Sequence, residues 1–215
     1  MNLSRFIVSV AAAMALLAGF AVEARTAADF FVSAPDEVLP LVPQSTRLDM
    51  LDYFSSGLST TSPNATRGRA RIMLNEPTKL QAELSRDSNI QIALFPAERD
   101  TVVAVIETVL TPVADSSVSF YDTSWNLLAL TMPSLKPIDF VPESLRKEAS
   151  KAELPDVVFG RIDFNPETGY LTVNNTTAGY YAEQDRPDGL ALMSTSIQYA
   201  LRGNRLRKVA NTSDK

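Results

Sequence analysis

Carboxylates are the side chains of this chain whose spacing could support catalysis. Glu107 lies in the otherwise apolar run "TVVAVIETVL", where burial would favour a protonated carboxyl able to act as a general acid. Asp49 and Asp52 lie three residues apart, on one side of a predicted helix. A glycosidase needs two carboxyl groups that face each other across a cleft, so these three residues are the catalytic candidates. The alternative places Glu107 at an edge and the two aspartates on a solvated helix face.

The absence of two residue types excludes several kinds of catalytic and metal site. The sequence contains no histidine and no cysteine, which excludes Ser-His-Asp and Cys-His nucleophiles, His/Cys zinc sites and thiol redox chemistry. "SLRK" gives Ser144 and Lys147 S-x-x-K spacing, but the S-D-N and K-T-G elements of penicillin-recognising enzymes are absent. "DRPDG" offers Asp185 and Asp188 without the ligand spacing of an EF-hand. A polar helix face and a plain loop are expected there, and no metal or cofactor is predicted.

Two groups of basic residues are candidates for binding an anion. Arg67, Arg69 and Arg71 alternate in "RGRAR", so on a strand they would share one face. The second group lies near the C-terminus: Arg202, Arg205, Arg207 and Lys208. Guanidinium groups suit carboxylate, sulfate or phosphate, so an anionic glycan or a lipid headgroup is a conceivable ligand. The alternative is that charge on exposed strands discourages edge-to-edge aggregation.

The only tryptophan of the chain lies in "SVSFYDTSWNLLAL". We expect a β-hairpin in which residues 122–124 turn the chain and Trp125 begins the returning strand. Tyr121 and Trp125 would then pack across the strands and keep their polar tips in water. The alternative is that the two rings form a ligand-binding platform, which makes them candidate binding residues.

The hydrophobic pattern predicts an α+β protein built mainly from antiparallel strands, and these strands must position the candidate groups. Apolar residues recur with a period of two in residues 69–75, 79–85 and 89–95, and the short connections between these runs favour a β-meander. The run 101–110 is apolar on both faces, which indicates a central strand with the sheet's core on one side and a helix on the other. Further strands are expected at "DVVFGRIDF" and "GYLTV", where the "NPETG" turn puts Gly169 at positive φ.

Two helices are expected, one packed on the strands of each half of the chain. The first lies near residues 45–57 and ends at Gly57, and the second lies near 142–152 and begins with Pro142. The inward-facing residues predicted from the 3.6-residue period are Leu48, Met50 and Leu51 in the first helix and Leu145, Ala149 and Leu154 in the second.

The N-terminal residues are typical of a secretory signal. One arginine precedes the apolar stretch 6–20, which is short for a membrane span, and small residues favour cleavage after Ala24. We therefore predict a signal peptide at 1–24, a first α+β module at 25–132, a linker at 133–141 and a second module at 142–215. The modules are either pseudo-repeats or parts of one compact domain. A periplasmic or secreted location follows from the signal.

Composition limits the partners. Hydrophobic residues make up 45% of the chain and charged residues 21%, as in an ordinary globular protein. The net charge of −5 gives no electrostatic basis for nucleic-acid binding. No transmembrane span is predicted in the mature chain, because no second apolar run approaches the length that a spanning helix needs.

Four stretches together resemble a family of exported Bacteroidetes proteins known only as a domain of unknown function: "FFVSAPDEVLPLV", "RLDMLDY", "DTVVAVIETVLTPVADSSVSFYDTSW" and "IQYALRGNRLRKV". The resemblance covers the mature chain and implies no activity, substrate or catalytic residue. Leu201 stands where that family often has tryptophan in its closing hairpin. "DTV" resembles the short O-glycosylation acceptor of exported Bacteroidetes proteins, which makes Thr101 a candidate modification site.

These observations favour an exported binding or protein-interaction module whose partner is unknown. An envelope protein, an anionic glycan or a lipid headgroup would each suit the candidate residues. The alternatives are a carboxylate-dependent glycan hydrolase and a structural envelope subunit, and the latter would expose large apolar patches.

Overall fold

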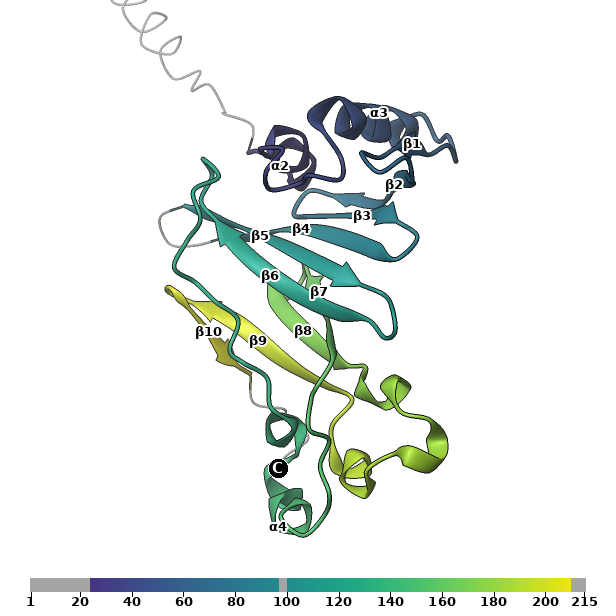
Figure 1. Cartoon of the computed structure of the whole chain (residues 1–215). Helices are drawn as coiled ribbons and strands as arrows, with labels where there is room; N and C mark the ends of the chain where they lie inside the picture. Colours follow the sequence, from purple (N-terminus) through teal and green to yellow (C-terminus); the bar gives the residue numbers. More distant parts are fainter. Residues whose placement is uncertain (1–23, 97–99, 210–215) are drawn as a thin grey trace, which may run out of the picture.

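The computed structural model describes residues 24–96 and 100–209. The predicted signal peptide therefore lies outside the described residues, apart from Ala24. Two antiparallel sheets pack face to face, and two helices cover the outer face of the larger sheet (Figure 1). This arrangement confirms the predicted α+β class and the antiparallel meander.

The larger sheet holds six strands in chain order, each paired antiparallel with the next. They are β1 (Ser62–Pro63), β2 (Arg69–Glu76), β3 (Lys79–Ser85), β4 (Ser88–Pro96), β5 (Thr101–Val109) and β6 (Asp115–Tyr121). The period of two explains the pairing, because the alternate residues Leu80, Ala82 and Leu84 of β3 are all buried. The β2–β3 register shifts between Ile72 and Leu74, so Met73 lies in a β-bulge.

The smaller sheet holds four strands in the order β10-β9-β8-β7. They are β7 (Gly160–Asn165), β8 (Tyr170–Asn175), β9 (Ser196–Arg202) and β10 (Arg205–Lys208). The turn between β7 and β8 is as predicted: Gly169 has a φ of 67°, and its N–H donates to the carbonyl of Asn165 at 2.9 Å.

The α-helices are α2 (Ala27–Ser33), α3 (Gln44–Ser55) and α4 (Arg146–Ala149). Short 3-10 helices occupy Pro137–Phe140, Glu143–Leu145, Thr177–Tyr180, Glu183–Asp185 and Asp188–Leu192. The first predicted helix corresponds to α3. The second predicted helix is much shorter than expected, because α4 ends at Ala149 and the chain then turns toward the 3-10 helix Asp188–Leu192. There the N–H of Glu153 donates to the carboxylate of Asp188 at 2.8 Å. Leu145 and Leu154 are half-buried there, and Ala149 is buried.

Helix α2 was not predicted, although its start carries a recognisable signal. Thr26 and Asp29 form a capping box, in which the N–H of Asp29 donates to Oγ1 of Thr26 and the N–H of Thr26 donates to the Asp29 carboxylate. Phe30 and Phe31 of this helix are fully buried.

The inner face of α3 differs from the prediction. Met50 is 1% exposed and Leu51 is half-buried, as expected. Leu48 is 52% exposed, whereas Arg47 is 0% exposed and takes the inward position instead. Arg47 can do so because backbone carbonyls accept from Nη1 and Asp36 accepts from Nη2, although its buried Nε has no hydrogen-bond partner among the described residues.

Two hydrophobic cores result, one on each face of the larger sheet. The first lies between α2, α3 and the sheet, and the second lies between the two sheets. Strand β5 contributes to both, since Val105 faces the helices and Ala104 and Ile106 face the second sheet. The predicted burial of this strand on both faces is confirmed. Phe95 contacts Phe164 across the second core, with 4.8 Å between ring centroids.

The outer edge of β7 is closed by side chains of the larger sheet. Gln91 donates from Nε2 to the carbonyl of Ile162 at 3.1 Å and accepts at Oε1 from the N–H of Phe164 at 3.3 Å. Lys79 donates to the carbonyl of Phe164 at 2.7 Å. Ser116 accepts from the N–H of Ile162 at 3.0 Å. These side chains satisfy backbone groups that a neighbouring strand would otherwise have to pair.

Candidate functional site

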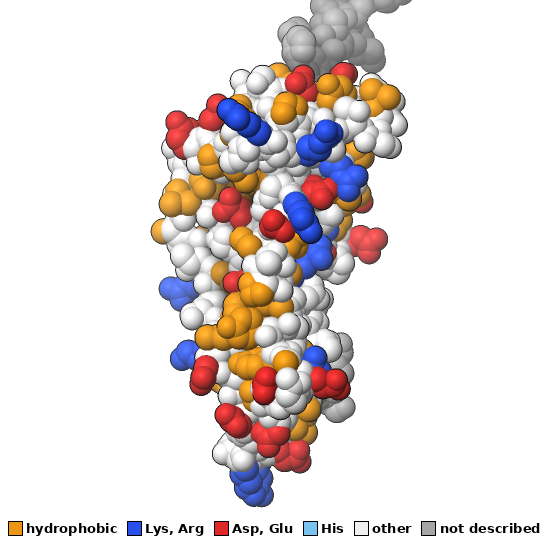
Figure 2. All heavy atoms as spheres, turned by 45° about the vertical axis from the view of Figure 1, so that its right-hand side comes forward, with side chains coloured by type: hydrophobic (Ala, Val, Ile, Leu, Met, Phe, Trp, Pro, Cys, Tyr) orange, Lys and Arg blue, Asp and Glu red, His pale blue; other side chains and the backbone are white. Residues whose placement is uncertain are grey.

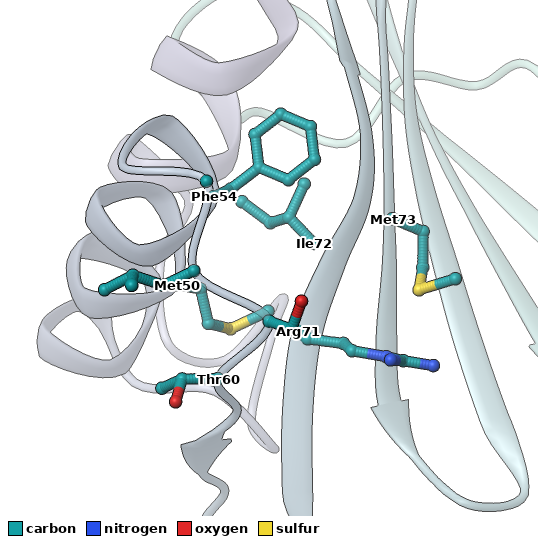
Figure 3. A pocket seen from close by; sticks show the side chains of 9 residues that line it. Met50, Phe54, Thr60, Arg71, Ile72 and Met73 are labelled. Carbon is teal, nitrogen blue, oxygen red and sulfur yellow. The ribbon is translucent and has the colours of Figure 1, made fainter.

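A groove of about 300 Å³ lies between the C-terminal end of α3, the loop that follows it, and β2. Figure 3 shows Met50 and Phe54 on the helix side with Ile72 of β2 between helix and strand, while the side chains of Arg71 and Met73 extend away from α3. The residues that line it are Met50, Phe54, Gly57, Leu58, Ser59, Thr60, Arg71, Ile72 and Met73. We call this the α3–β2 groove.

Several apolar side chains of the α3–β2 groove are open to solvent. Phe54 is 38% exposed, Leu58 is 55% exposed and Met73 is 52% exposed. Single exposed apolar residues are common on soluble proteins, but a set that lines one groove indicates a contact surface. None of the three was predicted as a site residue.

Gly57 positions two of these side chains by ending α3. Its φ of 67° allows the chain to reverse, so the N–H of Gly57 donates to the carbonyl of Phe54 at 3.1 Å and the N–H of Leu58 donates to that of Tyr53 at 2.9 Å. Phe54 and Leu58 are thereby brought to the same groove from either side of the turn. Apolar residues on both sides of a helix-ending glycine were the sequence signal that could have found them.

Strand β2 presents an open edge beside the groove. β1 pairs only with Arg69 and Ala70, so among the described residues no strand adjoins 71–76 on that side. An edge strand leaves backbone N–H and C=O groups free to pair with another chain. The groove and the open edge together form one surface.

The predicted basic row is only partly formed. Arg69 and Arg71 are exposed on one face of β2, but Arg67 lies in the preceding turn with a φ of 64°. The prediction that Arg67 shares this face is wrong, because Asn64 folds that turn by accepting the N–H of Gly68 at 2.7 Å. Arg71 forms an ion pair with Glu83, with 2.6 Å between Nε and Oε2. In Figure 2, basic and acidic side chains alternate in the upper part of the visible face, so the described residues of this face form no patch of a single charge.

The C-terminal basic residues lie on the second sheet. Arg205 and Arg207 are exposed on either side of the buried Leu206, so the two share one face of β10 as predicted. Arg202 is paired with Arg205 across the hairpin. Lys208 donates to the carbonyl of Asp139 at 2.6 Å.

Tyr121 and Trp125 lie apart from the groove, in a cluster with α2. Their ring centroids are 5.3 Å apart, and Trp125 meets Phe30 edge to face at 6.2 Å. Trp125 has a φ of 67° and Tyr121 makes a single bridge to Leu127, so the predicted returning strand does not form. These half-buried rings join the turn after β6 to α2. Ligand binding by them stays a prediction.

The catalytic candidates lie on different surfaces. Glu107 is exposed on β5 and lines a separate cavity of about 340 Å³ with Asp115 and Leu84. Glu107 therefore lacks the burial that a general acid at this position would need, because an open cavity adjoins it. Asp49 and Asp52 are exposed on α3, which places them on the solvated helix face of the alternative prediction.

The remaining candidates lie in ordinary surface environments. Ser144, Lys147 and Asp185 are exposed, and Asp188 holds the loop contact with Glu153. In residues 24–96 and 100–209, no group of three or more acidic side chains is placed to hold a metal ion. Thr101 is the half-buried first residue of β5, and its modification stays a prediction. No described helix is long and apolar enough to cross a membrane.

The geometry defines a protein of two stacked antiparallel sheets with a helical cap and an open groove. Among solved structures it is similar to a domain of an uncharacterized protein from Porphyromonas gingivalis W83, with 19% identity, a TM-score of 0.66, and coverage of 87% of this chain and 100% of that one. At this identity the likeness establishes the fold. No curated protein matches the sequence.

The chain belongs to the family described as "Protein of unknown function (DUF3256)", which matches residues 20–205. The predicted membership of a Bacteroidetes family of unknown function is thereby confirmed.

Proposed function

We propose that this protein is an exported protein-interaction module whose contact surface is the α3–β2 groove. The observation that carries the proposal is the combination of exposed apolar side chains with an unpaired sheet edge. Apolar pockets beside an open edge suit an added strand, because the backbone groups give affinity and the pockets select side chains. No comparable combination is found at the catalytic candidates among the described residues, so we favour interaction over hydrolysis.

The proposal of export rests on the secretory pattern of residues 1–24, and cleavage after Ala24 is compatible with the contacts made by the residues that follow it. Arg25 donates to the carbonyl of Thr123 at 3.0 Å and lies 3.9 Å from the ring centroid of Phe30, and Thr26 caps α2. All of these groups follow Ala24, so cleavage there leaves the contacts of α2 intact. We expect the protein recovered from its host's envelope to begin at Arg25 by mass spectrometry, and added mass on the peptide containing Thr101 would reveal a glycan.

The contact surface can be tested in the host by site-specific photo-crosslinking. A photoreactive amino acid replaces Met73 in one variant and Val157, which is 48% exposed and far from the groove in sequence, in a matched control. We expect a crosslinked protein, identified by mass spectrometry, at Met73 and not at Val157. Crosslinking that fails at Met73, or is equal at the two positions, contradicts the proposal.

A further inference from the structure

We infer that the partner at the α3–β2 groove is a second copy of this chain, paired antiparallel through β2 across a two-fold axis. The inference rests on the proposed function, because it names the occupant of the same surface. The larger sheets of the two copies would then join into one continuous sheet. A two-fold contact of this kind uses the same residues from both copies.

The two ends of the open edge carry opposite charges, which is the first reason to choose a second copy. Arg71 lies at one end of the edge and Glu76 at the other. In an antiparallel pairing centred between Met73 and Leu74, Arg71 of each copy lies opposite Glu76 of the other. Two complementary pairs form, since the symmetry repeats the contact. A parallel pairing would place like charges together.

The bulge at Met73 makes this register possible. In a regular strand, positions 71 and 76 face opposite sides of the sheet. The register shift between Ile72 and Leu74 returns them to the same side, as their partners on β3 show: Arg71 is paired with Glu83 and Glu76 with Lys79. Across the two-fold axis, the order of charges would be Glu83, Arg71, Glu76, Lys79, with alternating sign.

The centre of the same edge is apolar. Ile72, Met73 and Leu74 occupy it, and Met73 is 52% exposed in the single chain. The exposed side chains of Phe54 and Leu58 lie in the groove next to it, so a second copy on the edge would cover them as well. Burial of apolar surface would supply the affinity and the charge pairs would set the register.

In the smaller sheet, the edge strand β7 has no further strand beside it among the described residues, and side chains of the larger sheet close its outer edge instead. Side chains of the larger sheet satisfy the outer backbone groups of β7, as described above. Beyond Ala70, the described hydrogen bonds include no such closure of β2. The contrast between the closed edge of β7 and the open edge of β2 favours pairing of β2.

The experiment reverses single charges on the edge of β2, in protein that is produced and processed by its own host. The Glu76→Lys variant presents two basic groups at the edge, and the Arg71→Glu variant presents two acidic groups. Sedimentation velocity from micromolar to millimolar concentration measures the dimer dissociation constant. We expect a dimer for the unmodified protein, and a dissociation constant raised roughly tenfold or more for each variant alone, because two attractive pairs become repulsive.

Mixing the two variants in equal amounts is the decisive step. A mixed dimer places each introduced charge opposite its complement, so association should return to near the original strength, which a misfolded variant could not do. Glu148→Lys, an equal change of charge on the exposed face of α4, is the matched control and should leave the dimer unchanged.

Three results would overturn the inference: a monomer at every concentration, a dimer insensitive to Glu76→Lys, or variants that stay apart on mixing. The crosslinking experiment separates these failures from failure of the proposed function. A monomeric protein that still crosslinks through Met73 to a different, identified protein loses the second copy as partner but keeps the α3–β2 groove as its contact surface.

Discussion

Arg47 is fully buried and donates a 2.7 Å hydrogen bond to the carbonyl oxygen of Ala34, the residue that follows α2. The same nitrogen, Nη1, donates to the carbonyl of Phe31 at 2.9 Å, and Nη2 donates to Asp36 at 2.6 Å. Burial lowers the pKa of Arg47, and the carboxylate of Asp36 acts against this shift. The guanidinium group therefore holds the C-terminal end of α2 against α3.

Replacing Arg47 with methionine should lower the free energy of unfolding by about 3 kcal/mol, because two buried carbonyl oxygens lose their donor. The pair with Asp36 itself contributes less, since the Asp36 side chain is 60% exposed. Urea denaturation measures the change. Arg146→Met is the control: its pair with Glu143 is exposed and should contribute less than about 0.5 kcal/mol. Equal losses in the two variants would contradict the role of Arg47.

Replacing Gln91 with leucine should open the edge of β7. The carbonyl of Ile162 and the N–H of Phe164 lose their partners in a buried environment, which should cost about 2 kcal/mol of unfolding free energy. Amide hydrogen exchange at Phe164 should accelerate relative to amides that pair β7 with β8. The same change at the exposed Gln184 should alter neither quantity. Unchanged exchange at Phe164 would mean that the closure does not protect this edge.

The contacts of Trp125 predict a structural contribution. Trp125→Ala removes the ring that contacts Phe30 and Tyr121, and should lower the unfolding free energy by about 2 kcal/mol. Trp125→Phe keeps an aromatic ring and loses only a long 3.5 Å hydrogen bond to Ser33, so a loss below about 1 kcal/mol is expected. Thermal unfolding compares the two variants. If neither changes stability, the ring is free to serve another purpose.

Stability should fall in acid partly through the cap of α2. The backbone N–H of Thr26 donates to Asp29, which lowers the pKa of this carboxyl below its ordinary value of 3.8. The unfolded chain then binds more protons than the folded chain in the window below that value. The contribution of Asp29 is therefore present above the ordinary value and is lost as the pH falls through the folded-state pKa.

Asp29→Asn is the test of this linkage. The variant should have a smaller slope of unfolding free energy against pH in acid and should approach the unmodified protein at the lowest pH. Asp122, whose pKa is lowered chiefly by the side-chain hydrogen bond from Asn126, acts in the same direction and supplies a second variant, Asp122→Asn. Slopes identical to that of the unmodified protein would show that the cap does not titrate with folding.

Local patterns predicted the sheets well. The alternating residues of β3 have one buried face as predicted, whereas β4 is buried on both faces, since Ile92 faces the helices and Ala93 faces the second sheet. The turn at Gly169 depends on positive φ alone. Both signals are complete within a few neighbouring residues. The α3 boundary could be predicted for the same reason, because Gly57 ends the helix locally.

The errors concern contacts between distant parts of the chain. Arg47 can be buried only because Phe31 of α2 and Ala34, the residue after α2, present carbonyl oxygens to it, and no pattern within α3 reports them. The apolar neighbours of Glu107 in β5 could not decide whether it is buried, because its exposure depends on what covers that end of the strand. The α3–β2 groove was missed for a related reason: it joins residues from a helix, a loop and a strand, and depends on where β1 stops.

The closed edge of β7 also has a consequence for the order in which the chain assembles. The groups that receive β7 precede it in the sequence, so the larger sheet can present them before β7 arrives. Gly160, Ile162 and Phe164 face these groups, and a slip of one residue would instead offer them Arg161 and Asp163 and turn the apolar side chains of β7 out of the second core. Lys79, Gln91, Asp115 and Ser116 thus act as a template that disfavours a one-residue slip of the second sheet.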